Sequence, residues 1–134
     1  MLERLEQLER NVAELKNFKA NTSIEAIKSN LQKQWILRYG LFESIQIVID
    51  LTCHISSYYN LGNPKTYSGC VELLVKNKYL SNVLGEKLTS LVGLRNLLTH
   101  EYIAINIERL FKLLDNLDDF IDFAEEIKQW IQSE

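Results

Sequence analysis

Apolar residues recur every three or four positions along most of the chain, which is the pattern of amphipathic helices. The first such stripe consists of Leu2, Leu5, Leu8, Val12 and Leu15. A longer one follows the capping triplet at 21–23 and reaches about Tyr59; it consists of Ile24, Ile27, Leu31, Trp35, Phe42, Ile45, Ile49 and Cys53. We predict one helix for each stripe, with a bend in the second at Gly40. The β-branched run at 45–51 keeps helical spacing, so we interpret it as a buried helix.

The second half of the chain begins with a dense turn signal at residues 60–69, which include the single proline. A short helix is predicted over residues 70–77. Ser81 and Asn106 are suited to cap two further helices. The last of these carries the stripe Ile107, Leu110, Leu114, Leu117, Ile121, Ala124, Ile127 and Ile131. We therefore predict an all-α fold, an up-and-down bundle of four to five helices that forms one domain over residues 1–134.

Charge is unevenly distributed along the chain. The formal net charge of −3 argues against a protein that coats nucleic acid electrostatically. However, the segment 16–38 is locally basic, whereas the segment 101–134 is acidic. The two segments could contact a phosphate and a basic partner separately, or they could be two solvated helix faces.

The compartment is predicted from cysteine usage and hydropathy. Cys53 and Cys70 belong to no CxxC or Cys/His cluster, so we expect two free, reduced thiols in a cytoplasmic protein. No run of eighteen apolar residues occurs, and the charged N-terminal residues lack the order of a signal peptide. We expect no membrane association.

Candidate chemistry gathers at Arg95, His100 and Tyr102, because phosphate-loop, metal-ligand and nucleophile-elbow motifs are absent from the sequence. On a continuous helix Arg95 and His100 would lie roughly 140° apart, whereas Asn96 and His100 would share a face. We expect the helix to end near His100, where exposed carbonyls favour a protonated imidazole. Tyr102 would follow in a loop.

A single arginine and a single histidine form a thin catalytic set. Metal-free cleavage of RNA needs a base, an acid and a cation that stabilises the charge on phosphate. A two-fold dimer would supply two copies of each residue in one cleft, so a catalytic interpretation requires a homodimer. The alternative is that Arg95 and His100 are capping and ion-pair residues. Likewise, Asp50 and His54 could be a buried pair lining the same cleft or a local ion pair on one helix.

The segment Arg95-Asn96-Leu97-Leu98-Thr99-His100-Glu101-Tyr102 resembles the Arg-x4-His-x-Tyr motif of HepT-type HEPN proteins. The resemblance extends over roughly residues 24–125 and includes Asp50 to Ile55 and the loop at 64–67. It implies an all-helical, dimeric HEPN-type domain that acts as a metal-independent ribonuclease toxin of a toxin–antitoxin pair. It also implies no cofactor and no metal ligand.

The family's site residues are carried over to this chain as expectations. Arg95 and His100 would be the catalytic pair, with Asn96 and Asp50 as supporting polar residues. The resemblance further implies a cognate MntA-type nucleotidyltransferase antitoxin, which would silence the toxin by AMPylation of Tyr102.

Two features of the sequence depart from this picture. Many relatives carry a carboxylate about four residues before the position of Asp50, where this chain has Gln46. Affinity for RNA would also have to come from local basic residues such as Lys28, Lys33 and Arg38. The alternative function is a non-catalytic helical partner, or substrate-binding subunit, of a minimal nucleotidyltransferase.

Overall fold

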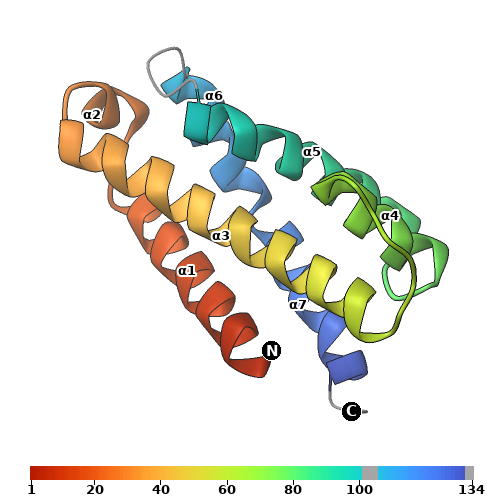
Figure 1. The fold of residues 1–134 in the computed structure, drawn as a ribbon. Helices are drawn as coiled ribbons and strands as arrows, with labels where there is room; N and C mark the ends of the chain where they lie inside the picture. Colours follow the sequence, from red (N-terminus) through yellow and green to blue (C-terminus); the bar gives the residue numbers. More distant parts are fainter. Residues whose placement is uncertain (101–105, 132–134) are drawn as a thin grey trace.

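Four long helices form the bundle. They are α1 (Leu2–Ala20), α3 (Leu31–Tyr58), α5 (Asn82–His100) and α7 (Asp118–Ile131). The computed structural model describes residues 1–100 and 106–131, apart from the side chains of Leu97 and His100. In Figure 1, α1 and α5 flank α3 on opposite sides, and α7 contacts both α1 and α5. The predicted all-α fold is confirmed, since no strand occurs in the part of the chain that the structure describes.

Short helices occupy the connections between the long ones. They are α2 (Ile24–Lys28), α4 (Tyr67–Lys76), α6 (Ile107–Leu113) and the 3-10 turn η1 (Leu114–Asn116). Residues 1–100 and 106–131 therefore contain seven α-helices instead of four or five, because two predicted long helices are each interrupted. None of the described helices combines the length and the hydropathy needed to cross a bilayer.

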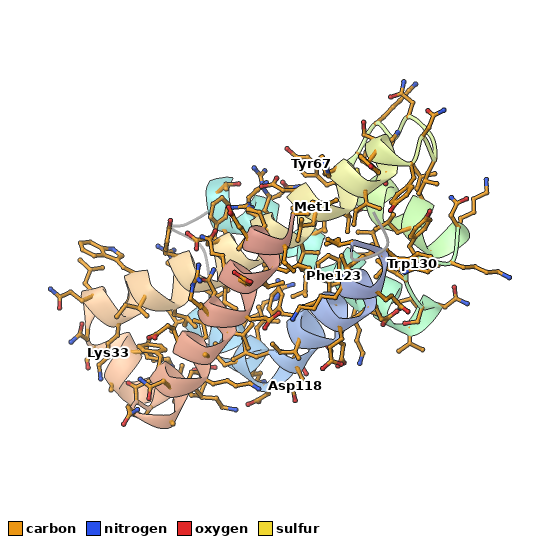
Figure 2. The ribbon with its side chains drawn as sticks, turned by 90° about the horizontal axis from the view of Figure 1, so that it is seen from below. Met1, Lys33, Tyr67, Asp118, Phe123 and Trp130 are labelled. Atoms are coloured by element: carbon orange, nitrogen blue, oxygen red, sulfur yellow. A yellow bond between two sulfur atoms is a disulfide. The ribbon has the colours of Figure 1, made fainter. Side chains whose placement is uncertain are left out.

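The core centres on α3, against which the predicted stripes of α1 and of the C-terminal segment pack together with α4 and α5. Leu5, Leu8, Val12 and Leu15 are buried, whereas Leu2 at the helix start is 44% exposed. Phe123 of α7 is fully buried and lies inside the bundle in Figure 2. Complete burial of such a side chain contributes roughly 1.5–3 kcal/mol relative to leaving it exposed.

The predicted second helix is broken at Ser29 and Asn30. Ser23 caps α2 by accepting from the Ala26 backbone N–H. Asn30 caps α3 by accepting from the Lys33 backbone N–H. The break changes which face of the segment meets the core, and as a result Leu31 and Trp35 are 59% and 57% exposed. Their assignment to the buried stripe was wrong.

Gly40 does not mark a bend, since α3 runs through it without interruption. A Cβ atom at this position would lie 2.7 Å from Cδ2 of Leu15. The glycine therefore allows α1 to approach α3 closely, a packing role that a sequence pattern does not distinguish from a kink.

The last predicted helix also begins where expected and then breaks. Asn106 accepts from the backbone N–H groups of Glu108 and Arg109, which confirms it as a cap. Ser81 accepts from the Leu84 N–H at the start of α5. The segment after Asn106 divides into α6, η1 and α7, yet Leu110, Leu117 and Ile127 of its stripe are buried.

The two cysteines are not free thiols. Cys53 of α3 and Cys70 of α4 form a disulfide, with their Cα atoms 4.9 Å apart. The prediction failed because the seventeen-residue separation carries no motif, and only the antiparallel return of α4 against α3 brings the two side chains together. The expectation of a cytoplasmic protein loses the support that free thiols gave it.

The basic and acidic segments pair with each other across the bundle. Lys16 binds Asp118 at 2.8 Å, Lys19 binds Asp115, and Lys28 binds Glu108. The Lys16 ammonium lowers the pKa of the Asp118 carboxyl through a hydrogen bond and its charge. These lysines are therefore occupied within the chain, which neither of the two interpretations of the charge pattern anticipated.

Candidate functional site

Arg95 of α5 is held against α3 and α4 by neutral groups. Its Nε–H donates to Oε1 of Gln46 at 3.0 Å. The guanidinium carbon lies 5.3 Å from the centre of the Tyr67 ring and 5.8 Å from that of Phe42. Both rings are within the range of cation–π attraction, and each restricts the orientation of the guanidinium plane.

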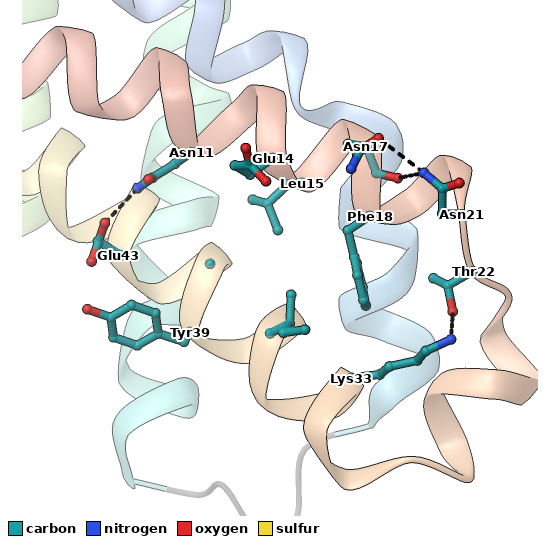
Figure 3. Close-up of a pocket in the computed structure, with 12 residues that line it drawn as sticks. Asn11, Glu14, Leu15, Asn17, Phe18, Asn21, Thr22, Lys33, Tyr39 and Glu43 are labelled. Atoms are coloured by element: carbon teal, nitrogen blue, oxygen red, sulfur yellow. Dashed lines mark hydrogen bonds between the residues drawn. The ribbon is translucent and has the colours of Figure 1, made fainter.

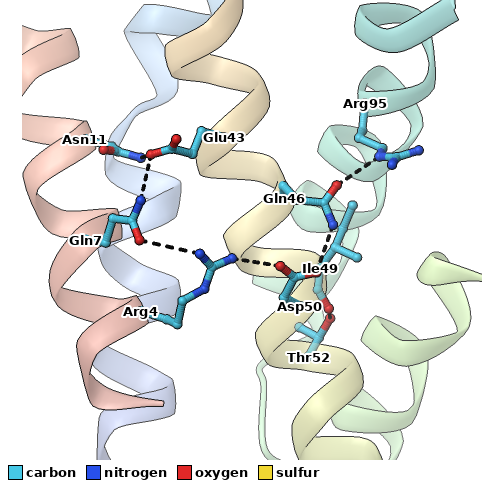
Figure 4. Close-up of polar contacts among 9 residues, drawn as sticks. All are labelled: Arg4, Gln7, Asn11, Glu43, Gln46, Ile49, Asp50, Thr52 and Arg95. Atoms are coloured by element: carbon cyan, nitrogen blue, oxygen red, sulfur yellow. Dashed lines mark hydrogen bonds and ion pairs between the residues drawn. The ribbon is translucent and has the colours of Figure 1, made fainter.

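A chain of polar contacts connects Arg95 to α1 through α3 (Figure 4). Nε2 of Gln46 donates to Oδ1 of Asp50 at 2.8 Å. The other Asp50 oxygen accepts from Arg4 at 2.7 Å. A carboxylate only accepts hydrogen bonds, so Asp50 orients the Gln46 amide with its nitrogen toward Asp50 and its oxygen toward Arg95.

This arrangement leaves the terminal nitrogens of the Arg95 guanidinium with little hydrogen bonding inside the described part of the chain. Its NH1 makes a long contact of 3.4 Å with Oδ1 of Asn96. No carboxylate of a described residue pairs with Arg95, although carboxylates are the usual partners of a half-buried arginine. Gln46 stands where many relatives carry a carboxylate, and it orients the arginine without neutralising its charge.

The structure places the predicted site residues unevenly. Arg95 and Asn96 lie side by side on α5, and His100 is its last residue, as expected, although its side chain is outside the described part. Tyr102 lies outside the described residues. Asp50 supports Arg95 only indirectly, through Gln46.

Asp50 and His54 form neither of the two predicted pairs. Asp50 is exposed and bonds to Arg4 and Gln46 instead. His54 is also exposed, and its ring stacks on that of Tyr58 with the centroids 6.2 Å apart.

Sequence reasoning missed Phe42 and Tyr67 as neighbours of Arg95. Tyr67 stood in the loop that resembled the family, but nothing in its spacing showed that α4 would place the ring against α5. Phe42 belonged to an apolar stripe and was interpreted as core.

A pocket of about 860 Å³ with several polar groups opens beside Asn96. We call it the Tyr67 pocket. It is lined by Ser57 of α3, the loop 62–66, Tyr67 and Ser68 at the start of α4, and Gly93 and Asn96 of α5. Since Tyr67 and Asn96 also contact Arg95, the pocket and the arginine form one continuous site.

A second pocket, between α1 and α3, has a different chemistry (Figure 3). It holds about 530 Å³ and includes Glu14 and Glu43. Glu43 accepts from Asn11 at 2.9 Å and from Gln7 at 2.8 Å. Hydrogen bonds, first from the Tyr39 hydroxyl and then from Asn11, lower the pKa of Glu43. This pocket therefore presents negative charge at neutral pH.

The fold and the site place this protein among HEPN-type helical bundles. A family model described as Ribonuclease HepT-like matches residues 8–127. The chain belongs to the HepT-like ribonuclease family.

Individual relatives agree with this assignment. The mRNA nuclease HepT of Shewanella oneidensis is 32% identical over 81 residues, a segment that spans 60% of this chain and 61% of that protein. The structure of the tri-AMPylated HEPN toxin of S. oneidensis, in complex with its MNT antitoxin, is similar with a TM-score of 0.86, 24% identity and 96% coverage of both chains. The cytosolic protein YutE of Bacillus subtilis is similar with a TM-score of 0.75, 16% identity, and 96% and 90% coverage. At these identities the structural likeness establishes the fold.

Proposed function

We propose that this protein is a metal-independent endoribonuclease, the toxin of a toxin–antitoxin pair, with Arg95 and His100 as its catalytic residues. The observation that carries the proposal is the guanidinium of Arg95, which is fixed by the Gln46 amide and two rings without a neutralising carboxylate from any described residue. Family membership and the likeness to an mRNA nuclease support RNA as the substrate.

The proposed reaction is a transesterification within RNA. One imidazole takes the proton of the 2′-OH as that oxygen bonds to phosphorus. The bond from phosphorus to the 5′ oxygen breaks, and a second imidazole protonates the leaving oxygen. Arg95 stabilises the charge that builds on the phosphate oxygens, to which its planar fork is matched.

Two imidazoles require two copies of the chain, since each supplies one motif histidine. We propose a homodimer in which two α5 helices bring their carboxyl ends to a shared cleft. A straight helix supports this arrangement, because it separates Arg95 and His100 by roughly 140° around its axis.

We further propose that a nucleotidyltransferase antitoxin of the MntA type silences the site by AMPylation of Tyr102. The tyrosine oxygen would attack the α-phosphorus of ATP and release pyrophosphate. A phosphate two residues from His100 repels an incoming RNA phosphate and fills the cleft. The related toxin that is tri-AMPylated in complex with an MNT antitoxin supports this regulation. A toxin with this substrate acts in the cytoplasm.

Expression of the wild-type chain and of the Arg95→Ala and His100→Ala variants in a bacterial host tests the activity. We expect growth arrest with wild type alone, and cleavage of purified RNA in the presence of a metal chelator. Arrest that persists in both variants would favour the alternative of a non-catalytic partner.

Intact-mass measurement tests the regulation. After incubation with ATP and an MntA-type nucleotidyltransferase, the wild-type chain should gain one AMP unit or a multiple of it. Tyr102→Phe should gain none. A gain that survives Tyr102→Phe would exclude this tyrosine as the acceptor.

A further inference from the structure

We propose that the Tyr67 pocket binds the nucleoside attached to the phosphate that Arg95 holds, with its base stacked on the Tyr67 ring. This inference rests on the RNA cleavage proposed above and assigns the substrate group that the pocket receives. The position of the pocket, its polar groups and its charge all suit such a ligand.

The position of the pocket suits a neighbour of the scissile phosphate. Tyr67 is 43% exposed, and the guanidinium carbon of Arg95 lies 5.3 Å from the centre of its ring. Asn96, the residue after Arg95, lines the pocket. When Arg95 binds a phosphate, the nucleoside attached to that phosphate can therefore reach this pocket.

The polar groups of the pocket suit a base and a ribose. The hydroxyls of Ser57 and Ser68 and the amide of Asn63 line it, and none of the three has a side-chain hydrogen bond to a described residue. Such groups can bond to the edge of an unpaired base and to a 2′-OH, while an aromatic ring stacks on the base.

The charge of the pocket distinguishes it from the hollows that contain carboxylates. No acidic residue of the described part of the chain lines it, and Lys65 stands in its loop without an ion pair to a described residue. The pocket between α1 and α3 contains Glu14 and Glu43, and the hollow between α5 and α7 contains three carboxylates, all of which repel a phosphate.

The remaining basic residues do not offer a better path for RNA. Lys28, which we expected to contact RNA, is paired with Glu108, and Lys33 donates to Thr22. The hollow beside Trp35 and Tyr39 is lined by Arg38 and by no acid among the described residues, but its surface is mainly ring and aliphatic. The Tyr67 pocket combines stacking, hydrogen bonding and a nearby cation.

Gly93 provides a selective way to fill the pocket. It lines the pocket, and a Cβ at this position meets no other atom within 4 Å. A phenylalanine there extends into the open space, and it also favours the helix more than glycine does. Gly93→Phe therefore blocks the pocket without touching Arg95 or the core.

The test measures binding of a fluorescein-labelled, single-stranded RNA dodecamer of mixed sequence to the full chain carrying His100→Ala, which prevents turnover. We expect Gly93→Phe and Tyr67→Leu each to weaken binding roughly 5- to 100-fold, the range of one lost base stack. Tyr67→Phe, which keeps the ring, should retain most of the affinity. Ser90→Phe, at an exposed position of α5 outside the pocket, is the matched control and should bind as His100→Ala alone does.

The outcomes separate this inference from the proposed function. If wild type cleaves RNA, and both Gly93→Phe and Tyr67→Leu bind as tightly as the Ser90→Phe control, the pocket assignment is overturned while the ribonuclease remains. If wild type neither cleaves nor binds RNA, both fall. Circular dichroism and solution mass identify a variant that loses its fold or its assembly, and in that case the other pocket variant decides.

Discussion

The cations of this protein are held in two different ways. On the side of the bundle where α1 meets α7, Lys16 and Lys19 each bind a carboxylate of the C-terminal segment. On the side where α3 meets α5, Arg95 is bound by an amide oxygen and lies over two aromatic rings. The first arrangement cancels the positive charge, and the second fixes its direction while preserving it.

This difference indicates which cations can receive an anion. A lysine that already faces a carboxylate must lose that partner before it can bind a phosphate, and exposed pairs of this kind contribute little to stability. Arg95 can bind an anion while its Nε–H keeps the bond to Gln46, since Nη1 has only the long contact with Asn96. We therefore assign the anion chemistry to Arg95 and a structural role to the lysines.

The largest expected effect is that of Arg95→Lys. A lysine keeps the charge but has neither the planar fork nor an Nε–H for Gln46. We expect the initial rate of RNA cleavage to fall by roughly 100-fold or more, as for the loss of a preorganised donor to a developing charge. The rate is measured with a fluorogenic RNA.

Arg109→Lys is the matched control for this variant. Arg109 is an exposed arginine of α6, outside the site, and its change should leave the rate unaltered. Equal rates for Arg95→Lys and Arg109→Lys would remove the distinction between the two kinds of cation.

A smaller effect is expected from Gln46→Glu. A carboxylate at this position would form an ion pair with Arg95, as carboxylates do with Lys16 and Lys19. We expect binding of RNA to the His100→Ala chain to weaken by roughly 10-fold, since hydrogen bonds to charged groups are stronger than those to neutral ones. Gln46→Met removes the contact with Arg95 without adding a charge and serves as the uncharged control. RNA binding by the Gln46→Glu variant that equals binding by the His100→Ala chain would contradict this role of Gln46.

The paired lysines of α1 should contribute to stability and not to RNA binding. Lys16→Ala combined with Lys19→Ala should lower the melting temperature by at most about 4 °C, because exposed ion pairs are weak. The difference from wild type should shrink in 1 M NaCl, where charges are screened. RNA binding should stay as in wild type, and a marked loss of it would show that these lysines contact the substrate.

The smallest expected effect is the pH dependence due to Glu43. Hydrogen bonds, foremost from the Tyr39 hydroxyl, lower the pKa of the Glu43 carboxyl in the folded chain. A lowered pKa stabilises the fold above the unfolded pKa, and this stabilisation is lost as pH falls through the folded pKa. Relative to Glu43→Gln, the melting temperature of wild type should therefore fall as the pH drops below the ordinary range of a glutamate carboxyl. Parallel melting curves for the two proteins would contradict the assignment.

The sequence predicted those parts of the fold that depend on local pattern. The stripe of α1 and the caps Ser23, Ser81 and Asn106 involve residues a few positions apart, and the structure confirms them. The break at Asn30 was missed because a cap inside an apolar stripe resembles an ordinary helical position until tertiary packing selects the face.

Contacts between distant parts of the chain could not be predicted in this way. The pairing of Lys16 with Asp118, the Cys53–Cys70 disulfide and the contact between Gln46 and Arg95 all depend on how the helices are arranged. For the site, the sequence indicated Arg95 and its neighbours, but it did not reveal that neutral groups hold the arginine. That property follows from α3, α4 and α5 meeting at one place.

The most direct test of the central claim is cleavage by mixed dimers of wild type and His100→Ala. The two chains are denatured together at equal concentrations and refolded, so that roughly half of the dimers carry a single intact histidine. A shared cleft that needs both imidazoles predicts that the mixture cleaves RNA at roughly a quarter of the rate of the same total amount of refolded wild type. A mixture that keeps about half of that rate would show that each copy works alone and that the site is not shared between two copies.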